Sequence, residues 1–509
     1  MAHTKSRVLW SVLVGSIVVA AGGFLASCVG NDEFRTLSTT RSAEMDRRAE
    51  QLRSAQLVLI YSASSRNNFE PCGCGGQYEG GLSRRATVFE EFRKINPNLV
   101  ALDAGDLIAG ASPSPTVALD HLGQAYHELG YDAILVGPEE LTTGFGEVRR
   151  IGEKQSLPFV LSNVKPKDGP GVPEVVRIER AGRKIAVIGV VGASHFESSP
   201  HLKRRRAEMV VEDPASAVAR LTAALRPASD LIILLSHIPA SERDGLAGKL
   251  GGVDVWIDNP GFLSFSDKKR AESQPAKPFE GIAPQAVLAT SSWENDRKIG
   301  LACLSFPLTG PKLASSEMFE LAKDIRENPR MLEIYDSYKF SSRQVLIPRL
   351  IPAGSRESRK DFAYTSSASC QGCHPAQYEL WAKTDHAHAF ATLVKECRDD
   401  DPACWACHST GFTEASGFVS PAETPELKDV GCQMCHRVDL RWHPMQKPKR
   451  PRAYNMVQTW HCSRCHIEHR SPKYRGNENE YREKIACPAM DRPQATTTQP
   501  AGGPKTVSP

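Results

Sequence analysis

One short motif occurs four times between residues 370 and 466, and it constrains the fold more than any other feature of the chain. Each copy reads C-x-x-C-H, which is the attachment signature of c-type haem. Two cysteines separated by two residues reach the two vinyl groups of one porphyrin, and the histidine that follows binds the iron. The four copies are Cys370, Cys373 and His374; Cys404, Cys407 and His408; Cys432, Cys435 and His436; and Cys462, Cys465 and His466.

This repeat predicts four c-type haems, each held by two cysteine thioethers and one proximal histidine. The competing interpretation is a pair of zinc ribbons, since C-x-x-C pairs also bind zinc. Zinc ribbons do not explain why a histidine follows every cysteine pair. Haem is therefore the favoured cofactor.

The second ligand of each iron is sought among the histidines outside the motifs. Candidates for the distal side are His386, His443, His461 and His469. His386 is favoured, because it stands four residues before Phe390 and the two would share one helix face that can turn onto a porphyrin. The sequence does not distinguish His461 from His469. Haems with two histidine ligands have no open site and pass electrons, whereas a five-coordinate haem could bind a small molecule.

The segment from Phe362 to Cys487 resembles the tetrahaem cytochrome c family that includes the electron carrier of hydroxylamine oxidation. The resemblance is carried by CQGCHPAQYELWAKTDHAHAF, CHSTGF, VGCQMCHRVDLRWH and CSRCHIEHRSPKY. It implies a mainly α and irregular multihaem domain that exchanges electrons with redox partner proteins. Similar proteins often place a histidine after a Tyr-x-x-Lys-Ile element, where this chain has Cys487 in YREKIACP.

The N-terminus has the pattern of an export signal: Lys5 and Arg7 precede an apolar run that ends in L-A-S-C at residues 25–28. This ending resembles a bacterial lipobox, so Cys28 is the predicted lipidated residue. An uncleaved membrane anchor is the alternative. Either way, the rest of the chain is expected outside the cytoplasm, on the periplasmic side. The net charge of +4 in 509 residues gives no argument for a nucleic-acid partner.

Residues 55–312 alternate apolar strand patterns with amphipathic helix patterns. Continuous Val, Ile and Leu runs separated by helices are typical of a buried α/β sheet. We expect strands at 57–62, 99–105, 133–137, 159–163, 184–192, 231–237 and 253–258, and helices at 82–95 and 214–228.

In the order and the sequence of its segments, this region resembles the 5′-nucleotidase type of calcineurin-like metallophosphoesterase. The matching segments are GGLSRRATVFEEFRK, NLVALDAGDLIAG, LGYDAILVGPEEL, PFVLSNV, KIAVIGVVG and DLIILLSHIP. The resemblance implies an α/β metallophosphoesterase-like sandwich. In that family, two metal ions activate a hydroxide and hold the phosphoryl oxygens.

Only two of the family's metal ligands remain in this chain, Asp106 in the Gly-Asp element and His237 in LLSHIP. The first Asp-x-His pair is replaced by SASS at 62–65, the G-N-H-E element by GPEE at 137–140, and the final G-H-x-H by DNPG at 258–261. The resemblance therefore implies a degenerate domain rather than a standard dinuclear phosphoesterase.

Two cysteines lie where the first lost ligands would be. Cys72 and Cys74 follow the first predicted strand, and Asp106, Glu139 and His237 are expected to converge on the same strand-end face. Two thiolates, an imidazole and a carboxylate suit zinc or another borderline metal. Two interpretations stay open: a non-catalytic domain that docks a partner or supports the cytochrome, and a rebuilt site that holds one non-haem metal.

Together these features predict a membrane-anchored, extracytoplasmic tetrahaem electron-transfer protein rather than a hydrolase. One alternative is a redox enzyme whose metal or thiol site near Cys72 and Cys74 is connected to the haems; another is an active 5′-nucleotidase fused to a cytochrome. The predicted organisation is a signal peptide with lipobox (1–28), a tether (29–54), the degenerate α/β domain (55–312), a helical connector (313–361), the tetrahaem domain (362–488) and a disordered tail (489–509).

Overall fold

The computed structural model describes most of the chain between residues 43 and 487. The described residues are 43–69, 80–108, 114–259, 277–278, 287–290, 297–308, 310–350, 363–396, 398–414, 416–436, 438, 459–466, 471, 473–474 and 477–487. The predicted lipobox and tail lie outside them, as do Cys28, Cys72, Cys74, His443 and His469. No helix within the described ranges is long and apolar enough to cross a membrane.

Six strands form the first sheet, in the spatial order β14-β13-β1-β2-β3-β4. The four strands β1 to β4 run parallel, and β13 and β14 add an antiparallel edge. Every residue of β1, β2 and β3 is buried, as expected for central parallel strands covered on both faces. The strands are β1 (Leu57–Ser62), β2 (Leu99–Asp103), β3 (Ala133–Leu135), β4 (Phe159–Val160), β13 (Lys298–Ser305) and β14 (Lys312–Glu320).

The second sheet also has six strands, in the order β11-β12-β10-β9-β7-β6. The strands β7, β9, β10 and β12 run parallel, and β6 and β11 are antiparallel edges. A separate two-stranded sheet pairs β5 with β8. The strands are β5 (Val164–Pro166), β6 (Val175–Arg180), β7 (Arg183–Val191), β8 (Met209–Val211), β9 (Leu231–His237), β10 (Val255–Asn259), β11 (Lys277–Pro278) and β12 (Val287–Thr290).

The two sheets pack into a sandwich around one shared hydrophobic core. Side chains alternate along β7: Ile185 and Val187 join the shared core, whereas Ala186 and Ile188 join a second cluster beneath α10 and α11. The helices of this part are α3 (Ala43–Ser54), α4 (Leu82–Ile95), α5 (Pro115–Leu129), α6 (Pro138–Leu141), α7 (Phe145–Gln155), α8 (His195–Ser198), α9 (Pro200–Arg205), α10 (Pro214–Leu225) and α11 (Ala240–Ala247). The predicted mixed α/β fold is confirmed.

The strands predicted at 57–62 and 231–237 and the helix predicted at 82–95 have the observed bounds. The helical connector predicted from residue 313 is wrong in its first part, because Lys312–Glu320 forms β14. Its backbone pairs with β13 along nearly its whole length, and this non-local pairing overrides the local helix preference of SSEMFELA. The helix α13 (Pro329–Leu350) begins instead at a proline, which favours the first helical position.

The predicted tether at 29–54 contains more structure than a solvated linker would. Its second half is α3, whose Met45 and Leu52 are buried in the core of the sandwich. This helix therefore belongs to the α/β domain, and the domain begins before residue 55.

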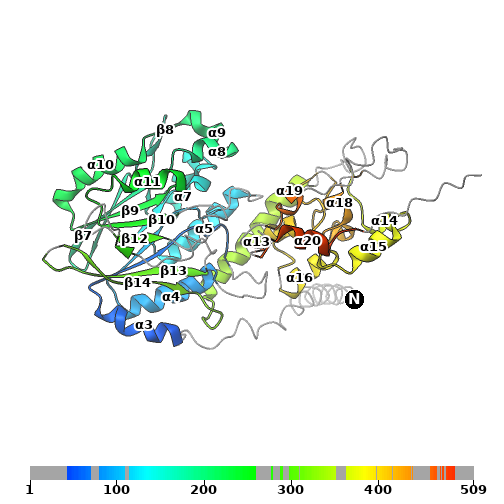
Figure 1. Cartoon of the computed structure of the whole chain (residues 1–509), viewed down its shortest axis with the longest axis horizontal. Coiled ribbons are helices and arrows are strands. Elements are labelled where there is room, and N and C mark those ends of the chain that lie inside the picture. Colours follow the sequence, from blue (N-terminus) through cyan, green and yellow to red (C-terminus); the bar gives the residue numbers. More distant parts are fainter. Residues whose placement is uncertain are drawn as a thin grey trace, which may run out of the picture.

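The described residues of the C-terminal part form short helices and irregular segments, around a core of eight buried side chains among them. Figure 1 shows it beside the sandwich, with α13 leading from one to the other. The helices are α14 (Ala368–Gln371), α15 (Pro375–Ala382), the 3₁₀ helix η4 (Asp385–His388), α16 (Ala389–Lys395), α17 (Pro402–His408), α18 (Cys432–Cys435), α19 (Thr459–Cys462) and α20 (Glu478–Lys484).

Candidate functional site

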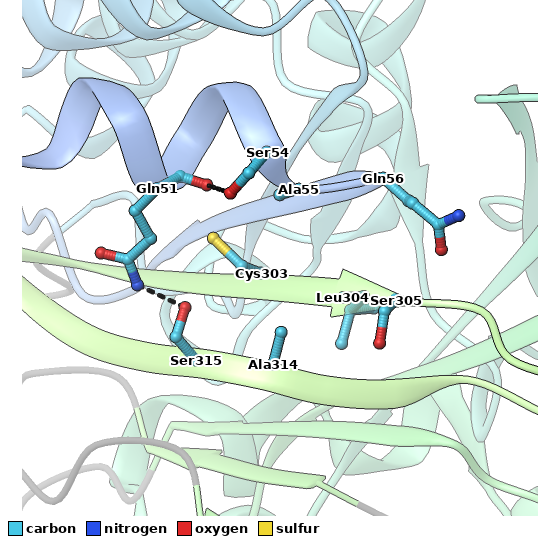
Figure 2. Close-up of a pocket in the computed structure, with 9 residues that line it drawn as sticks. All are labelled: Gln51, Ser54, Ala55, Gln56, Cys303, Leu304, Ser305, Ala314 and Ser315. Atoms are coloured by element: carbon cyan, nitrogen blue, oxygen red, sulfur yellow. Dashed lines mark hydrogen bonds between the residues drawn. The ribbon is translucent and has the colours of Figure 1, made fainter.

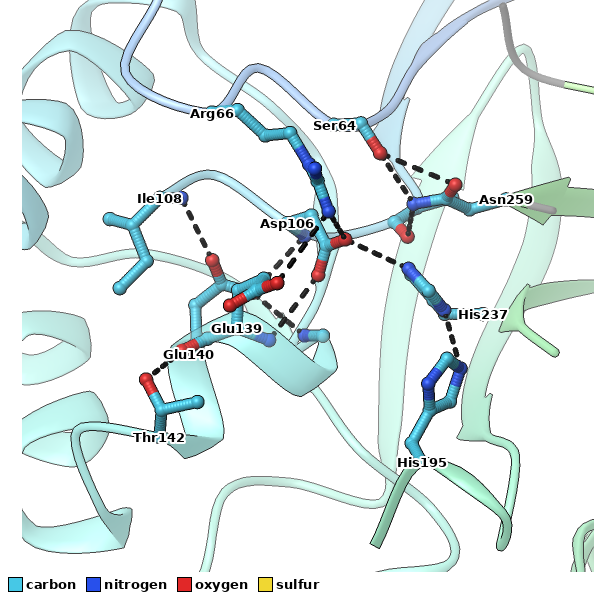
Figure 3. Close-up of polar contacts among 12 residues, drawn as sticks. Ser64, Arg66, Asp106, Ile108, Glu139, Glu140, Thr142, His195, His237 and Asn259 are labelled. Carbon is cyan, nitrogen blue, oxygen red and sulfur yellow. Dashed lines mark hydrogen bonds and ion pairs between the residues drawn. The ribbon is translucent and has the colours of Figure 1, made fainter. Parts of the chain in front are cut away.

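The strand ends of the sandwich gather a cluster of polar side chains (Figure 3). Asp106 follows β2 in the first sheet, and His237 ends β9 in the second. His237 Nε2 lies 2.9 Å from Asp106 Oδ2, so the two predicted site residues are in contact across the sandwich. Both are buried, with 1% and 3% of their surfaces exposed.

Backbone geometry around Asp106 is unusual. Asp106 itself has φ 63° and Gly105 has φ 88°, so consecutive residues are in the left-handed region. A Cβ atom on Gly105 would lie 3.0 Å from Gly137 Cα, so the close approach and the positive φ both favour glycine there. This close approach brings the turn after β2 against the start of α6, where Glu139 and Glu140 lie.

Arg66 provides a fixed positive charge in this cluster. Its Nη2 lies 3.3 Å from Asp106 Oδ2 and 3.5 Å from Glu139 Oε1, and its side chain is 13% exposed. Burial alone would raise the pKa of Asp106, but His237 and Arg66 beside it hold that pKa well below its usual range. Both acidic side chains expected to bind a metal are thus engaged by a guanidinium.

Glu140, rather than the predicted Glu139, is the fully buried carboxylate of the cluster. Its Oε2 accepts hydrogen bonds from the backbone N–H groups of Gly137 at 2.9 Å and Asp106 at 3.1 Å, and its Oε1 accepts from Ile108 at 3.0 Å. Burial and the nearby Asp106 carboxylate raise the pKa of Glu140 to about 8. Glu140 therefore has a structural role, closing the turn after β2 onto α6.

His195, at the start of α8, extends the cluster into a row of three groups. Its Nε2 lies 3.0 Å from His237 Nδ1. Because the Asp106 carboxylate only accepts, the Nε2–H of His237 donates to it. Burial and the neighbouring His237 lower the pKa of His195 to about 4, so its imidazole is neutral. The three side chains therefore form a continuous row of polar contacts from His195 to Asp106.

Two of these residues are not indicated by the sequence resemblance, Arg66 and His195, whereas Glu140 falls on the glutamate of the family's G-N-H-E element. His195 follows the strand predicted at 184–192 by three residues, and this position near a strand end is the one signal that could have pointed to it. Within the ranges that the structure covers, no three His, Cys, Asp or Glu side chains group as metal ligands. The non-haem metal, which also involves Cys72 and Cys74, stays a prediction.

Replacing His195 with asparagine should reduce the loss of stability in acid. The pKa of His195 is lowered from 6.5 to about 4 by burial and His237, against the opposing charges of Asp106 and Glu242. The unfolded chain takes up the proton first, so this stabilisation is complete above pH 6.5 and is lost as the pH falls toward 4. Between pH 6.5 and pH 4, the free energy of unfolding of the wild type should fall by about 2 kcal/mol more than that of the variant. Urea unfolding of the N-terminal domain would measure it, and equal losses would contradict the prediction.

A pocket of about 270 Å³ lies at the other end of β1, between α3 and the strands β13 and β14 (Figure 2). It is lined by uncharged residues, with Gln51 donating to Ser315 Oγ across it. Cys303 faces this pocket, and burial raises the pKa of its thiol. The pocket is thus separate from the cluster around Asp106, which lies after the carboxyl end of β1.

The C-terminal part brings the four C-x-x-C-H motifs together. The Cys370 thiol is hydrogen-bonded to Cys432, and the Cys465 thiol to Cys407, so the first motif meets the third and the second meets the fourth. All eight motif cysteines are free of disulfides. The motifs therefore converge although they lie on four different helical segments.

Two of the motif histidines, His408 and His466, are held as ligands of a metal would be. His408 Nδ1 lies 2.6 Å from the carbonyl oxygen of Ala389, and His466 Nδ1 lies 3.0 Å from Ser471 Oγ. Each hydrogen bond fixes the ring through Nδ1 and leaves Nε2 for an iron, which is how histidine ligands are oriented in metal sites.

Two histidines outside the motifs, both predicted as distal ligands, lie beside motif histidines. The rings of His386 and His466 are tilted by 58° to each other, with centroids 6.0 Å apart. Burial, with His374 and His461 nearby, lowers the pKa of His436, so His461 belongs to the neighbourhood of the first and third motifs. The remaining candidates, His443 and His469, lie outside the described residues.

Comparisons with known proteins match both parts of the chain. A family model described as cytochrome c554 and c-prime matches residues 369–437. Cytochrome c-554 of Nitrosomonas europaea is 27% identical over 152 residues, which are 24% of this chain and 65% of that protein. The 5′-nucleotidase of Bos taurus is 29% identical over 186 residues, which are 35% of this chain and 32% of that protein. Both predicted resemblances are confirmed.

A solved 5′-nucleotidase precursor from Thermus thermophilus aligns with 57% of this chain and 59% of its own, at 19% identity and a TM-score of 0.46. The chain spans about a third of the curated 5′-nucleotidases that it matches and about two thirds of cytochrome c-554. The similarity to cytochrome c-554 implies c-type haem.

The residues of the C-terminal part fit such a group. Helix α15 carries Tyr378, Leu380 and Trp381, which are only half-buried, and none of its residues is fully buried. Large apolar side chains beside the motif cysteines are what a domain built around porphyrins requires, because the apolar macrocycle completes the core.

Proposed function

We propose that this chain is an extracytoplasmic, membrane-anchored electron-transfer protein that carries four c-type haems. The observation that carries the proposal is the convergence of four C-x-x-C-H motifs within a segment similar to cytochrome c-554. When bound, the haems supply one-electron chemistry. The export pattern ending in L-A-S-C supports the location and the lipid anchor at Cys28.

The motif residues would hold the haems through two thioethers each, with His374, His408, His436 and His466 as proximal ligands. His386 is the proposed distal ligand of the fourth-motif haem, because its ring centroid lies 6.0 Å from that of His466. Haems with two histidine ligands leave no position for a substrate, which favours electron transfer over chemistry at the iron.

The N-terminal domain, in this proposal, is no longer a phosphoesterase. Two family ligands remain, Asp106 and His237, and they are hydrogen-bonded to each other. The Arg66 guanidinium contacts Asp106 and Glu139, where it opposes the binding of a divalent cation by charge and by occupying the carboxylates. A dinuclear centre needs bridging ligands free to bind two ions, and this cluster does not offer them.

Haem content tests the main proposal. The mature, exported protein should give four haems per chain by mass and by pyridine haemochrome spectra. A variant with Cys462→Ala and Cys465→Ala should give three and keep the other motifs loaded, since each cysteine pair anchors its own porphyrin. Fewer than four haems in the wild-type protein would overturn the tetrahaem assignment.

Phosphate release tests the degenerate domain. The protein should not hydrolyse 5′-AMP or p-nitrophenyl phosphate when Mn²⁺ or Zn²⁺ is added, because Arg66 engages the remaining carboxylates. Metal-dependent hydrolysis that disappears in Asp106→Asn would instead support the 5′-nucleotidase alternative.

A further inference from the structure

Helix α13 is shared by the two halves of the described structure. Met331 and Ile334, in its first half, are buried in the core of the α/β sandwich. Leu346, near its other end, is buried in the core of the cytochrome part. With 22 residues, the helix is about 33 Å long and spans the distance between the two cores. The cytochrome part is therefore fixed to the sandwich by a packed helix.

Aromatic side chains hold the first half of α13 in place. Tyr335 and Tyr338 are 3% and 2% exposed, and both stack on Phe69, with ring centroids 5.5 Å and 5.1 Å away. His121 of α5 adds an edge contact to Tyr338. Tyr335 is thus positioned by the N-terminal domain.

Polar residues on the same face of α13 reach an acidic pair just before α17, the helix that carries the second haem motif. Tyr335, Lys339 and Arg343 follow one another at intervals of four residues and so share one face. Lys339 Nζ lies 3.3 Å from Asp400 Oδ1, and Arg343 Nη1 lies 2.9 Å from Asp400 Oδ2. The Tyr335 hydroxyl donates to Asp401 Oδ2 at 2.5 Å.

Asp401 connects this contact to the haem attachment site. Asp401 is 4% exposed. Its Oδ1 accepts a hydrogen bond from the backbone N–H of Ala403 at 2.8 Å, and this contact caps the N-terminus of α17. Its Oδ2, the atom bound by Tyr335, lies 3.6 Å from Cys404 Sγ. That sulfur is the thioether anchor in the proposed function. A carboxylate is therefore held next to the position of one haem by a residue of another domain.

We propose that the N-terminal domain sets the reduction potential of the second-motif haem through Tyr335, which holds the Asp401 carboxylate against Cys404. A negative charge at this position stabilises the oxidised haem over the reduced one, because reduction removes a positive charge. The N-terminal domain then contributes to electron transfer by holding the cytochrome part in place and by shifting the reduction potential of one haem. This inference rests on the proposed function, but it needs only that the second motif binds haem.

Spectroelectrochemical titration of the full-length haem-loaded protein tests the proposal. Asp401→Asn keeps the helix cap and removes the charge, so one haem should be reduced at a higher potential while the others change little. Tyr335→Phe keeps the aromatic stack and should shift the same haem. That shift should be absent when Asp401→Asn is already present, because the hydroxyl acts through the carboxylate.

Two controls separate tuning from general effects. Asp168→Asn removes an exposed negative charge between β5 and β6, and Tyr338→Phe removes a hydroxyl from the same aromatic stack. Shifts in Asp401→Asn no larger than in Asp168→Asn, or a Tyr335→Phe shift that persists unchanged in the Asp401→Asn background, would overturn the inference. Failure of the proposed function would be seen separately, as missing haem before any titration.

Discussion

Replacing Arg85 with methionine should lower the free energy of unfolding of the N-terminal domain by about 3–5 kcal/mol. Arg85 is fully buried, and its Nη1 donates to Tyr131 at 2.8 Å and to Ser62 and Ser65 at 3.2 Å and 3.1 Å. The same atom lies 3.9 Å from Asp103 Oδ2, which is also fully buried. Methionine fills the volume but leaves the Asp103 charge without its cation in the low-dielectric core.

A double-mutant cycle shows whether charge is the cause. In the Asp103→Asn background, the further cost of Arg85→Met should be clearly smaller, because no buried charge is left behind. The surface variant Arg149→Met loses an exposed pair with Glu153 and should change stability by less than about 0.5 kcal/mol. Urea unfolding followed by circular dichroism would measure all of these proteins. A cost for Arg85→Met as small as that for Arg149→Met would refute the argument.

The sequence predicts the sandwich well because its central strands are locally distinct. Short continuous apolar runs such as LVLIYS and LIILLSH are typical of covered parallel strands, and β1 and β9 have the expected bounds. β14 could not be predicted in this way. Its residues have a helix-compatible pattern, and only the distant β13 makes them a strand.

The same distinction applies to the site. Asp106 and His237 follow strand ends, and parallel topology alone brings such positions to one face. Arg66 and His195 also belong to the site, but the directions of their side chains depend on loop geometry. At Arg66 this includes a left-handed φ of 47°. The ion pairs of Arg66 with Asp106 and Glu139 therefore depend on the three-dimensional fold, and no local sequence pattern predicts them.

For the cytochrome part, the spacing of the C-x-x-C-H motifs predicts where haems attach, but not how the motifs are arranged in space. C-x-x-C-H is a local chemical requirement, so all four motifs are readable in the sequence. Which motifs meet depends on the folding of the whole segment, and so does the approach of His386 to His466, 80 residues apart. The local sequence of α13 also does not show that the helix packs into two cores, because its partners come from both halves of the chain.

Replacing Trp405 with alanine should lower the free energy of unfolding of the cytochrome part by about 3–5 kcal/mol. Trp405 is 1% exposed and packs edge-on against Phe412 and Phe418, each with ring centroids 5.5 Å away. Its Nε1 donates to the carbonyl oxygen of Asp399 at 2.9 Å. Because this core contains only eight buried side chains among the described residues, the largest of them cannot be removed without leaving a cavity that its few neighbours are unable to fill.

Trp405→Phe provides the matched control, since it keeps an aromatic ring in the core and loses mainly the hydrogen bond to Asp399, at a cost of about 1 kcal/mol plus the smaller volume. Thermal unfolding followed at the Soret band would rank wild type, Trp405→Phe and Trp405→Ala in that order. Trp405 lies between Cys404 and Cys407, so the alanine variant should also show incomplete haem attachment at the second motif, because the helix that presents the two cysteines is no longer held in place. Equal unfolding temperatures for Trp405→Ala and wild type would show that haem insertion, rather than this apolar core, carries the stability of the domain.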